Sequence, residues 1–150
     1  MLWRAGLLVV GVAVWLAAGC GGRTESEERE QSHLKPLAIL YGQFVGEHQG
    51  RPPKDEQEFK QYVRSQSPEV LASFGISDAD TVFISSRDGQ PYVVRYGNAA
   101  KTGPPGPGGQ PVIAYERTGV SGKRFVASSI GAVEEVDEAR FKELVPNAAP

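Results

Sequence analysis

The hydrophobic and polar positions of this chain of 150 residues divide it into three stretches of different character. After the single positive charge of Arg4, residues 5–19 contain no charged residue and no strong polar group. Residues 21–32 contain no apolar residue of any size, which is typical of a flexible tether. From residue 33 onward apolar positions recur with helical and strand periods, so we expect one domain over residues 33–146 and a tail over 147–150.

Helical segments are expected in the first part of this domain. Apolar residues at intervals of three and four predict a long helix over residues 33–49, with Ser32 as its cap. Asp55 and Glu58 have the spacing of a capping box, so a second helix is expected to begin there. A brief third helical turn is expected to follow and to end at Gly75.

The second part of the domain has the pattern of strands separated by turns. Residues 81–86 and 92–96 predict a hairpin around an Asp-Gly turn, followed by a mobile Pro/Gly loop over residues 97–111. Three more strands and a last helix capped by Asp137 are expected, at residues 112–116, 123–128, 132–136 and 138–145. The predicted fold is α+β, with an N-terminal helix and short helices packed on an antiparallel β-meander.

Composition narrows the class of protein. The chain holds 16 Lys and Arg against 18 Asp and Glu, and loss of the leader would remove one of the cations. A mildly acidic chain is unsuited to nucleic acid, whose phosphates attract basic surfaces, so no nucleic-acid partner is expected. The sequence has one Cys and therefore no pair for a disulfide, so the core must come from apolar packing.

The single cysteine lies where the apolar leader gives way to polar sequence, at the end of Leu16-Ala17-Ala18-Gly19-Cys20. A charged start, an apolar run and small residues before a cleavage point are the pattern of a secretory signal peptide. The stretch resembles the bacterial lipobox, with cleavage between Gly19 and Cys20 and lipidation of the Cys20 thiol. It departs from the usual form at Ala17, where Leu is the common residue. The alternatives are an uncleaved membrane anchor, for which the run is short, and an incidental cysteine.

The lipobox resemblance implies a cellular location and a lipid anchor for the protein. Residues 1–19 would be a lipoprotein signal peptide, and residues 20–32 a lipidated Cys with its flexible tether. Acyl chains such as palmitate on Cys20 would hold the protein at the cell membrane, because each buried CH₂ contributes ~0.8 kcal/mol. Gly21 stands where an Asp would retain a lipoprotein at the inner membrane. The resemblance therefore favours the outer membrane if the host has two.

Polar groups that could do chemistry are scattered through the second half of the domain. The candidate acids are Asp88, Glu116, Glu134 and Glu135, and the candidate nucleophiles are Ser85, Ser86, Ser128 and Ser129. No histidine is near them in sequence and no Gly-x-Ser-x-Gly elbow occurs, so we expect no catalytic site and assign no cofactor.

Metal-ligating residues do not form a recognisable pattern. His33 and His48 would lie about 22 Å apart on one helix, at ~1.5 Å per residue, which is too far for a shared ion. Asp78, Asp80 and Asp88 lack the regular alternation of an EF-hand loop, so capping and turn roles are expected for them and no metal site is assigned.

The order of elements resembles the heads of pilins and type II secretion pseudopilins. The likeness is best from Val112-Ile-Ala-Tyr-Glu116 through Gly122-Lys-Arg-Phe-Val126 to Asp137-Glu-Ala-Arg-Phe141. The chain departs from the family at Ser129-Ile-Gly-Ala132, where Asp-Gly-His is usual, and its leader lacks the prepilin pattern. The resemblance implies a pilin-head-like domain on a lipid anchor.

These observations predict a lipid-anchored, non-catalytic protein of the cell envelope. Its small binding or structural domain would face the periplasm or the exterior, and its partner would be an envelope protein or an envelope polymer. One alternative is an accessory, pseudopilin-like subunit of a secretion or pilus-type machine. An envelope hydrolase is the remaining alternative, because groups distant in sequence can meet in the fold.

Overall fold

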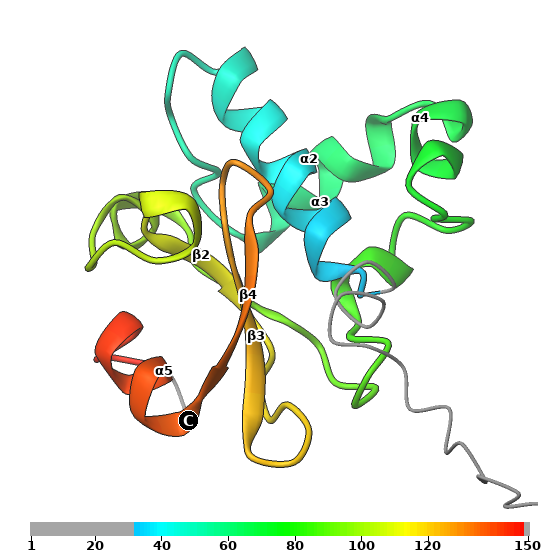
Figure 1. Cartoon of the computed structure of the whole chain (residues 1–150). Coiled ribbons are helices and arrows are strands. Elements are labelled where there is room, and N and C mark those ends of the chain that lie inside the picture. Colours follow the sequence, from blue (N-terminus) through cyan, green and yellow to red (C-terminus); the bar gives the residue numbers. More distant parts are fainter. Residues whose placement is uncertain (1–31, 149–150) are drawn as a thin grey trace, which may run out of the picture.

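The computed structural model describes residues 32–148 as an α+β fold, in which N-terminal helices pack against a four-stranded antiparallel sheet (Figure 1). The predicted sites at Gly19 and Cys20 lie outside the described residues. The elements in chain order are α2 (Leu34–Glu47), α3 (Glu56–Ser65), α4 (Pro68–Ser73), η1 (Thr81–Phe83), β1 (Val93–Val94), η2 (Gly97–Lys101), η3 (Pro107–Gly109), β2 (Val112–Tyr115), β3 (Lys123–Ser128), β4 (Val133–Asp137) and α5 (Glu138–Leu144).

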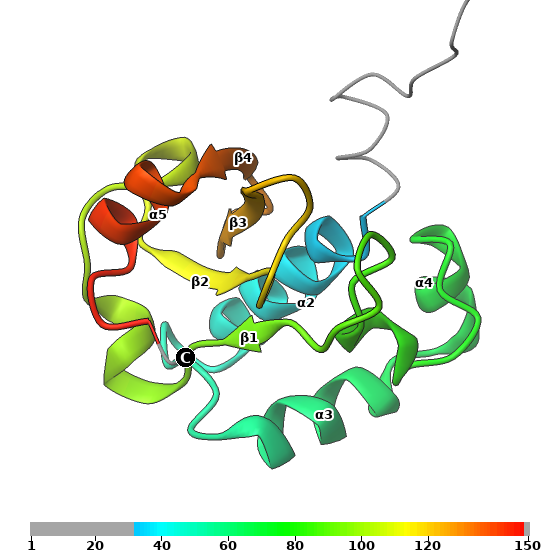
Figure 2. The same ribbon diagram turned by 90° about the horizontal axis from the view of Figure 1, so that it is seen from below.

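The sheet is a meander in the order β1-β2-β3-β4, and every neighbouring pair is antiparallel. Its two faces are covered by different helices (Figures 1 and 2). One face packs against the N-terminal helices through a core that includes Leu37, Phe59 and Phe125. The other face packs against α5 through a smaller core that includes Tyr115 and Phe141. Alternation along β3 separates the two cores, because successive side chains of a strand point to opposite faces.

Local capping chemistry sets the beginnings of three helices, and the caps at Asp55 and Asp137 are those that the sequence predicts. The side chains of Asp55, Ser67 and Asp137 accept the N–H groups of Glu58, Val70 and Arg140 respectively. At α2 the prediction is one residue out. His33 is the N-cap, and the Ser32 Oγ accepts the N–H of Leu34 at 3.2 Å.

The predicted strand over residues 81–86 is wrong in its first half. Residues 81–83 form the short helix η1, and only Ile84 makes a β-bridge, to Pro91. The reason is local: an Asp78 Oδ1 accepts the N–H of Asp80, and the Asp78 carbonyl accepts the Thr81 hydroxyl. Such side-chain turns compete with strand pairing for the backbone. The partner strand, expected over residues 92–96, is reduced to Val93–Val94 and pairs with β2 instead.

The Pro/Gly segment over residues 97–111 contains the two short helices η2 and η3. Ala100 is buried within the main core, and Pro107 is buried at the start of η3. The sequence predicts a mobile loop here, whereas the structure shows a segment that packs on the sheet. The last strand is shifted by one residue, to Val133–Asp137, because Asp137 ends β4 and also caps α5. The last helix begins at Glu138 as predicted and ends one residue earlier than predicted, at Leu144.

Helix α2 lies so close to the sheet that one of its positions has no room for a side chain. A Cβ atom on Gly42 would lie 2.1 Å from the backbone oxygen of Ser129. In residues 32–148 no helix combines the length and the apolar character that crossing a membrane requires.

Candidate functional site

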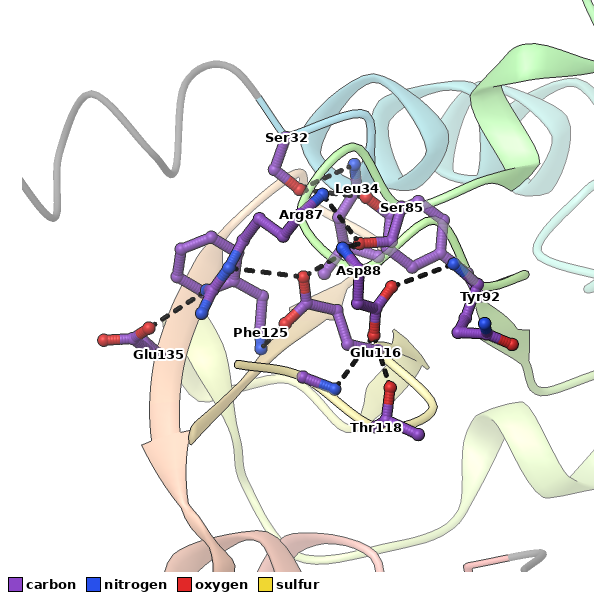
Figure 3. Close-up of polar contacts among 12 residues, drawn as sticks. Ser32, Leu34, Ser85, Arg87, Asp88, Tyr92, Glu116, Thr118, Phe125 and Glu135 are labelled. Atoms are coloured by element: carbon purple, nitrogen blue, oxygen red, sulfur yellow. Dashed lines mark hydrogen bonds and ion pairs between the residues drawn. The ribbon is translucent and has the colours of Figure 1, made fainter. Parts of the chain in front are cut away.

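Four of the candidate residues that are distant in sequence come together beside the N-terminus of α2 (Figure 3). Together with Arg87 they form a group of five residues that we call the carboxylate cluster: Ser85, Arg87, Asp88, Glu116 and Glu135. Ser85, Arg87 and Asp88 come from the turn after η1, Glu116 directly follows β2, and Glu135 lies on β4. The cluster therefore joins the turn to the end of β2 and to β4.

Glu116 is the centre of the cluster and is completely buried, with 0% of its surface exposed. Its Oε1 accepts the Ser85 hydroxyl at 3.1 Å and lies 3.6 Å from the Arg87 Nε. Its Oε2 accepts the backbone N–H of Phe125 at 2.8 Å. Burial raises the pKa of Glu116, and the hydrogen bonds and the Arg87 charge only partly oppose it. Both carboxylate oxygens are thus occupied by protein groups.

Arg87 supplies the positive charge of the cluster. Its guanidinium centre lies 4.1 Å from the centre of the Phe125 ring, in the geometry of a cation–π contact. The Arg87 Nη1 forms an ion pair with Glu135 Oε1 at 3.0 Å, although the angles are not those of a hydrogen bond. Lys123 reaches the second oxygen of Glu135 at 3.6 Å. Since the Arg87 side chain is only 10% exposed, this pairing takes place largely away from water.

Asp88 fixes the turn rather than taking part in the ion pairs. One of its oxygens accepts the Thr118 hydroxyl at 2.7 Å and the N–H of Gly119 at 3.0 Å, and the other accepts the N–H of Gln90. Burial alone would raise the pKa of Asp88, but these hydrogen bonds together lower it. Asp88 therefore has the turn role that the sequence predicts for it, and it also ties the turn to the loop after β2.

The other candidate residues do not join the cluster. Glu134 and Glu135 are adjacent on β4, so Glu134 points to the opposite face of the sheet. Ser128 is buried at the far end of β3, and its Oγ has no hydrogen-bond partner among residues 32–148. Ser129 follows it there, and Ser86 is exposed in the turn.

The histidines and the remaining aspartates have structural contacts. The His33 Nδ1 lies 3.0 Å from the carbonyl oxygens of both Thr81 and Ile84, and His48 stacks on Phe44. Asp80 pairs with Arg64 at 2.8 Å. Within the described range 32–148, no group of three or more His, Cys, Asp or Glu side chains is arranged to hold a metal ion.

Sequence reasoning missed Arg87, whose positive charge partly compensates the largely buried carboxylates of Glu116 and Glu135. In the sequence Arg87 is one residue of a polar turn, and nothing in its neighbours distinguishes it from an exposed arginine. The only available signal is Glu116 itself, an acid that directly extends a strand whose four residues are all buried. A carboxylate in such a position requires a cationic or hydrogen-bonding partner.

A second feature that the sequence did not reveal is a groove of about 680 Å³ between α3 and the edge strand β1. We call it the α3–β1 groove. Figure 2 shows β1 running alongside α3, at the edge of the sheet. The lining combines apolar and charged side chains: Phe83, Ile84, Pro91, Tyr92, Val93, Val94 and Tyr96, with Glu56, Lys60, Arg64, Asp80, Thr81 and Arg117. Its volume is within the usual range of about 300–1,000 Å³ for ligand pockets.

The chain matches no protein family model, no curated protein and no solved structure. The features that bear on its function are therefore the leader sequence, the carboxylate cluster and the α3–β1 groove.

Proposed function

We propose that this chain is a lipoprotein of the bacterial cell envelope, anchored through Cys20, and that its folded domain binds another envelope protein. The observation that carries the proposal is the sequence Leu16-Ala17-Ala18-Gly19-Cys20 after an apolar leader. The tether of residues 21–32 supports it, because such a segment would hold the domain roughly 20 Å from a bilayer at ~5–6 Å × √n.

The carboxylate cluster supports a binding role over a hydrolytic one. A general acid or base must reach a substrate proton, and a nucleophile must reach an electrophile. Glu116 is fully buried, and its oxygens are occupied by Ser85, Arg87 and the Phe125 N–H. The same contacts explain the cluster as a device that fastens the turn of residues 84–91 to the sheet.

The alternative function, an accessory subunit of a secretion or pilus-type machine, is favoured by the order of the helices and strands. A long N-terminal helix packed on a four-stranded antiparallel meander is what the resemblance to pilin and pseudopilin heads implies. For this alternative, chains crosslinked in intact cells are expected to give a ladder of multiples of the monomer mass. The proposed binding role instead predicts a single heterologous product, and a ladder would replace the proposal by the alternative.

The test of the anchor is intact mass spectrometry of the protein extracted from host membranes. The expected result is an N-terminus at Cys20 that carries the mass of the acyl groups, and the loss of this mass in Cys20→Ala. Ala17→Leu is the matched control, because it restores the common lipobox residue and should leave processing intact. An unmodified Cys20 or a retained leader would overturn the proposal. Density fractionation of the membranes then tests the expected outer-membrane location in a host with two membranes.

A further inference from the structure

We propose that the α3–β1 groove receives an extended segment of a partner protein. This segment adds to β1 as a further strand and directs an acidic side chain toward Lys60 and Arg64. This inference rests on the proposed function, which places the partner in the cell envelope, and it adds where on the domain that partner binds. The binding geometry itself comes from the residues that line the groove.

The backbone of β1 determines which polar groups face the groove. Val93 pairs with Tyr115, and the N–H of Arg95 donates to the Ile113 carbonyl at 2.8 Å. Residues of an antiparallel strand alternate between bonding one neighbour and bonding the other. The N–H and C=O of Val94 are therefore directed away from β2 and into the groove, and the N–H of Tyr96 follows two residues later.

The same side of the strand is already used at its beginning. The N–H of Tyr92 donates to the Phe83 carbonyl at 2.9 Å, and Ile84 bridges Pro91. Residues 83–84 thus pair with the outer edge of the sheet as far as Tyr92. The next backbone groups on this edge are those of Val94. An added strand would continue the pairing that residues 83–84 begin, as in binding by β-strand addition.

The floor of the groove suits apolar side chains of an extended peptide. Phe83 and Tyr92 are almost completely buried and form part of the main core, so the floor is rigid. Ile84 is 38% exposed, which is high for a large apolar residue of this domain. Because successive residues of a strand point to opposite sides, every second residue of the peptide would meet this floor.

The charged rim favours an acidic occupant. Glu56, Lys60 and Arg64 are four residues apart and form one stripe along α3. With Asp80 and Arg117 included, the rim holds three cations and two carboxylates, in a chain whose formal net charge is −2. Lys60 pairs with Glu56 at 2.6 Å and Arg64 pairs with Asp80 at 2.8 Å. Both pairs are at least partly exposed to solvent, so little free energy is needed to exchange one carboxylate for another.

Two other occupants fit less well. The tether of residues 21–31 is rich in glutamate, but it has no apolar residue for the floor of the groove. A second copy that paired through its own β1 would bring another rim of the same positive balance into the groove, and like charges oppose each other.

The test uses the purified full chain in detergent and fluorescent seven-residue peptides, in which aliphatic residues alternate with threonine and the central polar position is glutamate. Binding is measured by fluorescence anisotropy. Val94→Pro removes the N–H that faces the groove while the bonds of Val93 and Arg95 to β2 remain, and it should weaken binding about tenfold. Val94→Ala is the control, because it keeps this N–H and should stay close to the wild type.

The contributions of charge and of backbone hydrogen bonding are then measured separately, by changing either the protein or the peptide. Lys60→Glu combined with Arg64→Glu should weaken the glutamate peptide about tenfold and strengthen a lysine counterpart. Peptides with N-methyl groups on alternate residues should lose binding to the unchanged protein, so the test does not depend on Val94→Pro being folded.

Four outcomes would overturn the inference: no binding by any peptide, equal binding to folded Val94→Pro, equal binding of the N-methylated peptides, or tighter binding of a peptide of residues 21–31. None of these measurements depends on the acyl groups. A failure here therefore leaves the mass-spectrometric test of Cys20 unaffected, and the reverse also holds.

Discussion

Glu116 receives its contacts from three places in the chain: the Ser85 hydroxyl, the Arg87 side chain and the Phe125 N–H. The three contacts are needed because a buried carboxylate without partners is unstable. Removal of the cation leaves Glu116 and Glu135 close together with reduced compensation. The single residue Arg87 therefore decides whether these acids can remain inside the domain.

Replacement of Arg87 tests this point directly. Arg87→Met keeps much of the side-chain volume but removes the charge, so the free energy of unfolding is expected to fall by about 3 kcal/mol. Urea unfolding of the full chain in detergent measures the change. Arg64→Met is the matched control, since its pair with Asp80 is exposed and should contribute no more than about 1 kcal/mol. Equal losses in the two variants would contradict the central role of the Arg87 charge.

At the scale of elements, the fold depends on how closely α2 approaches the sheet. Gly42 and Gly46 are one turn apart on this helix, but their surroundings differ. A Cβ on Gly42 would collide with the Ser129 carbonyl oxygen, whereas a Cβ on Gly46 would meet nothing within 4 Å. The two glycines therefore form a matched pair for measuring the contact between helix and sheet.

Gly42→Ala is expected to destabilise the domain by about 2 kcal/mol, because α2 must move away from β3 to admit the methyl group. Gly46→Ala is expected to stabilise it by about 1 kcal/mol, since alanine is the better helix former at an open position. Thermal unfolding followed by circular dichroism compares the two. A gain in stability for Gly42→Ala would show that α2 tolerates a displacement from the sheet.

The short edge strand is also decided at the scale of elements. Residues 81–86 have the apolar composition of a strand, but Asp78 binds the backbone and side chain of the following residues and favours the helix η1. Residues 83–84 therefore cover only the beginning of β1, and the remaining edge lies in the α3–β1 groove.

For the whole molecule, two glutamates give opposite contributions to the dependence of stability on pH. Hydrogen bonds from the Arg51 side chain and the Lys54 N–H lower the pKa of Glu58 to about 2. Its contribution is present above its ordinary pKa and is lost as the pH falls toward about 2. Burial raises the pKa of Glu116, so the folded state binds this proton more tightly than the unfolded state does. The contribution of Glu116 to stability is therefore present at low pH and is lost as the pH rises through its folded pKa.

The expected result for Glu58→Gln is a flatter loss of stability between about pH 5 and pH 2, with an effect at neutral pH of no more than about 1 kcal/mol because Arg51 is half exposed. Urea unfolding at a series of pH values measures it. Glu47→Gln serves as the control, since Glu47 lies on the exposed surface, where it accepts the Tyr62 hydroxyl. An unchanged acid limb in Glu58→Gln would remove Glu58 from the explanation.

Glutamine does not titrate, so in Glu116→Gln the free energy of unfolding should no longer decrease as the pH rises through the folded pKa of Glu116. The difference in unfolding free energy between the variant and the wild type should therefore change across this pH range. The same urea series measures it, and Glu134→Gln is the control on the opposite face of β4. A difference between Glu116→Gln and the wild type that is the same at every pH would instead indicate loss of hydrogen bonding alone.

The sequence by itself determined the elements whose physics is local. A cap such as Asp55 or Asp137 needs only a donor three residues away, and both caps form as predicted. The strands of residues 112–137 are also close to their predicted ranges, because their alternation and intervening turns lie within a few residues. The leader ending at Cys20 is a sequence signal of the same local kind, and its meaning remains a prediction.

Only the tertiary structure decided which distant groups meet. The partners of Glu116 lie 31 residues away at Ser85 and 9 residues away at Phe125, and no local pattern encodes those separations. The pairing of Val93 with Tyr115 and the groove beside Val94 likewise result from competition between segments for the same edge of the sheet. Such competition is settled by the total burial and hydrogen bonding of the fold, which no single stretch of sequence contains.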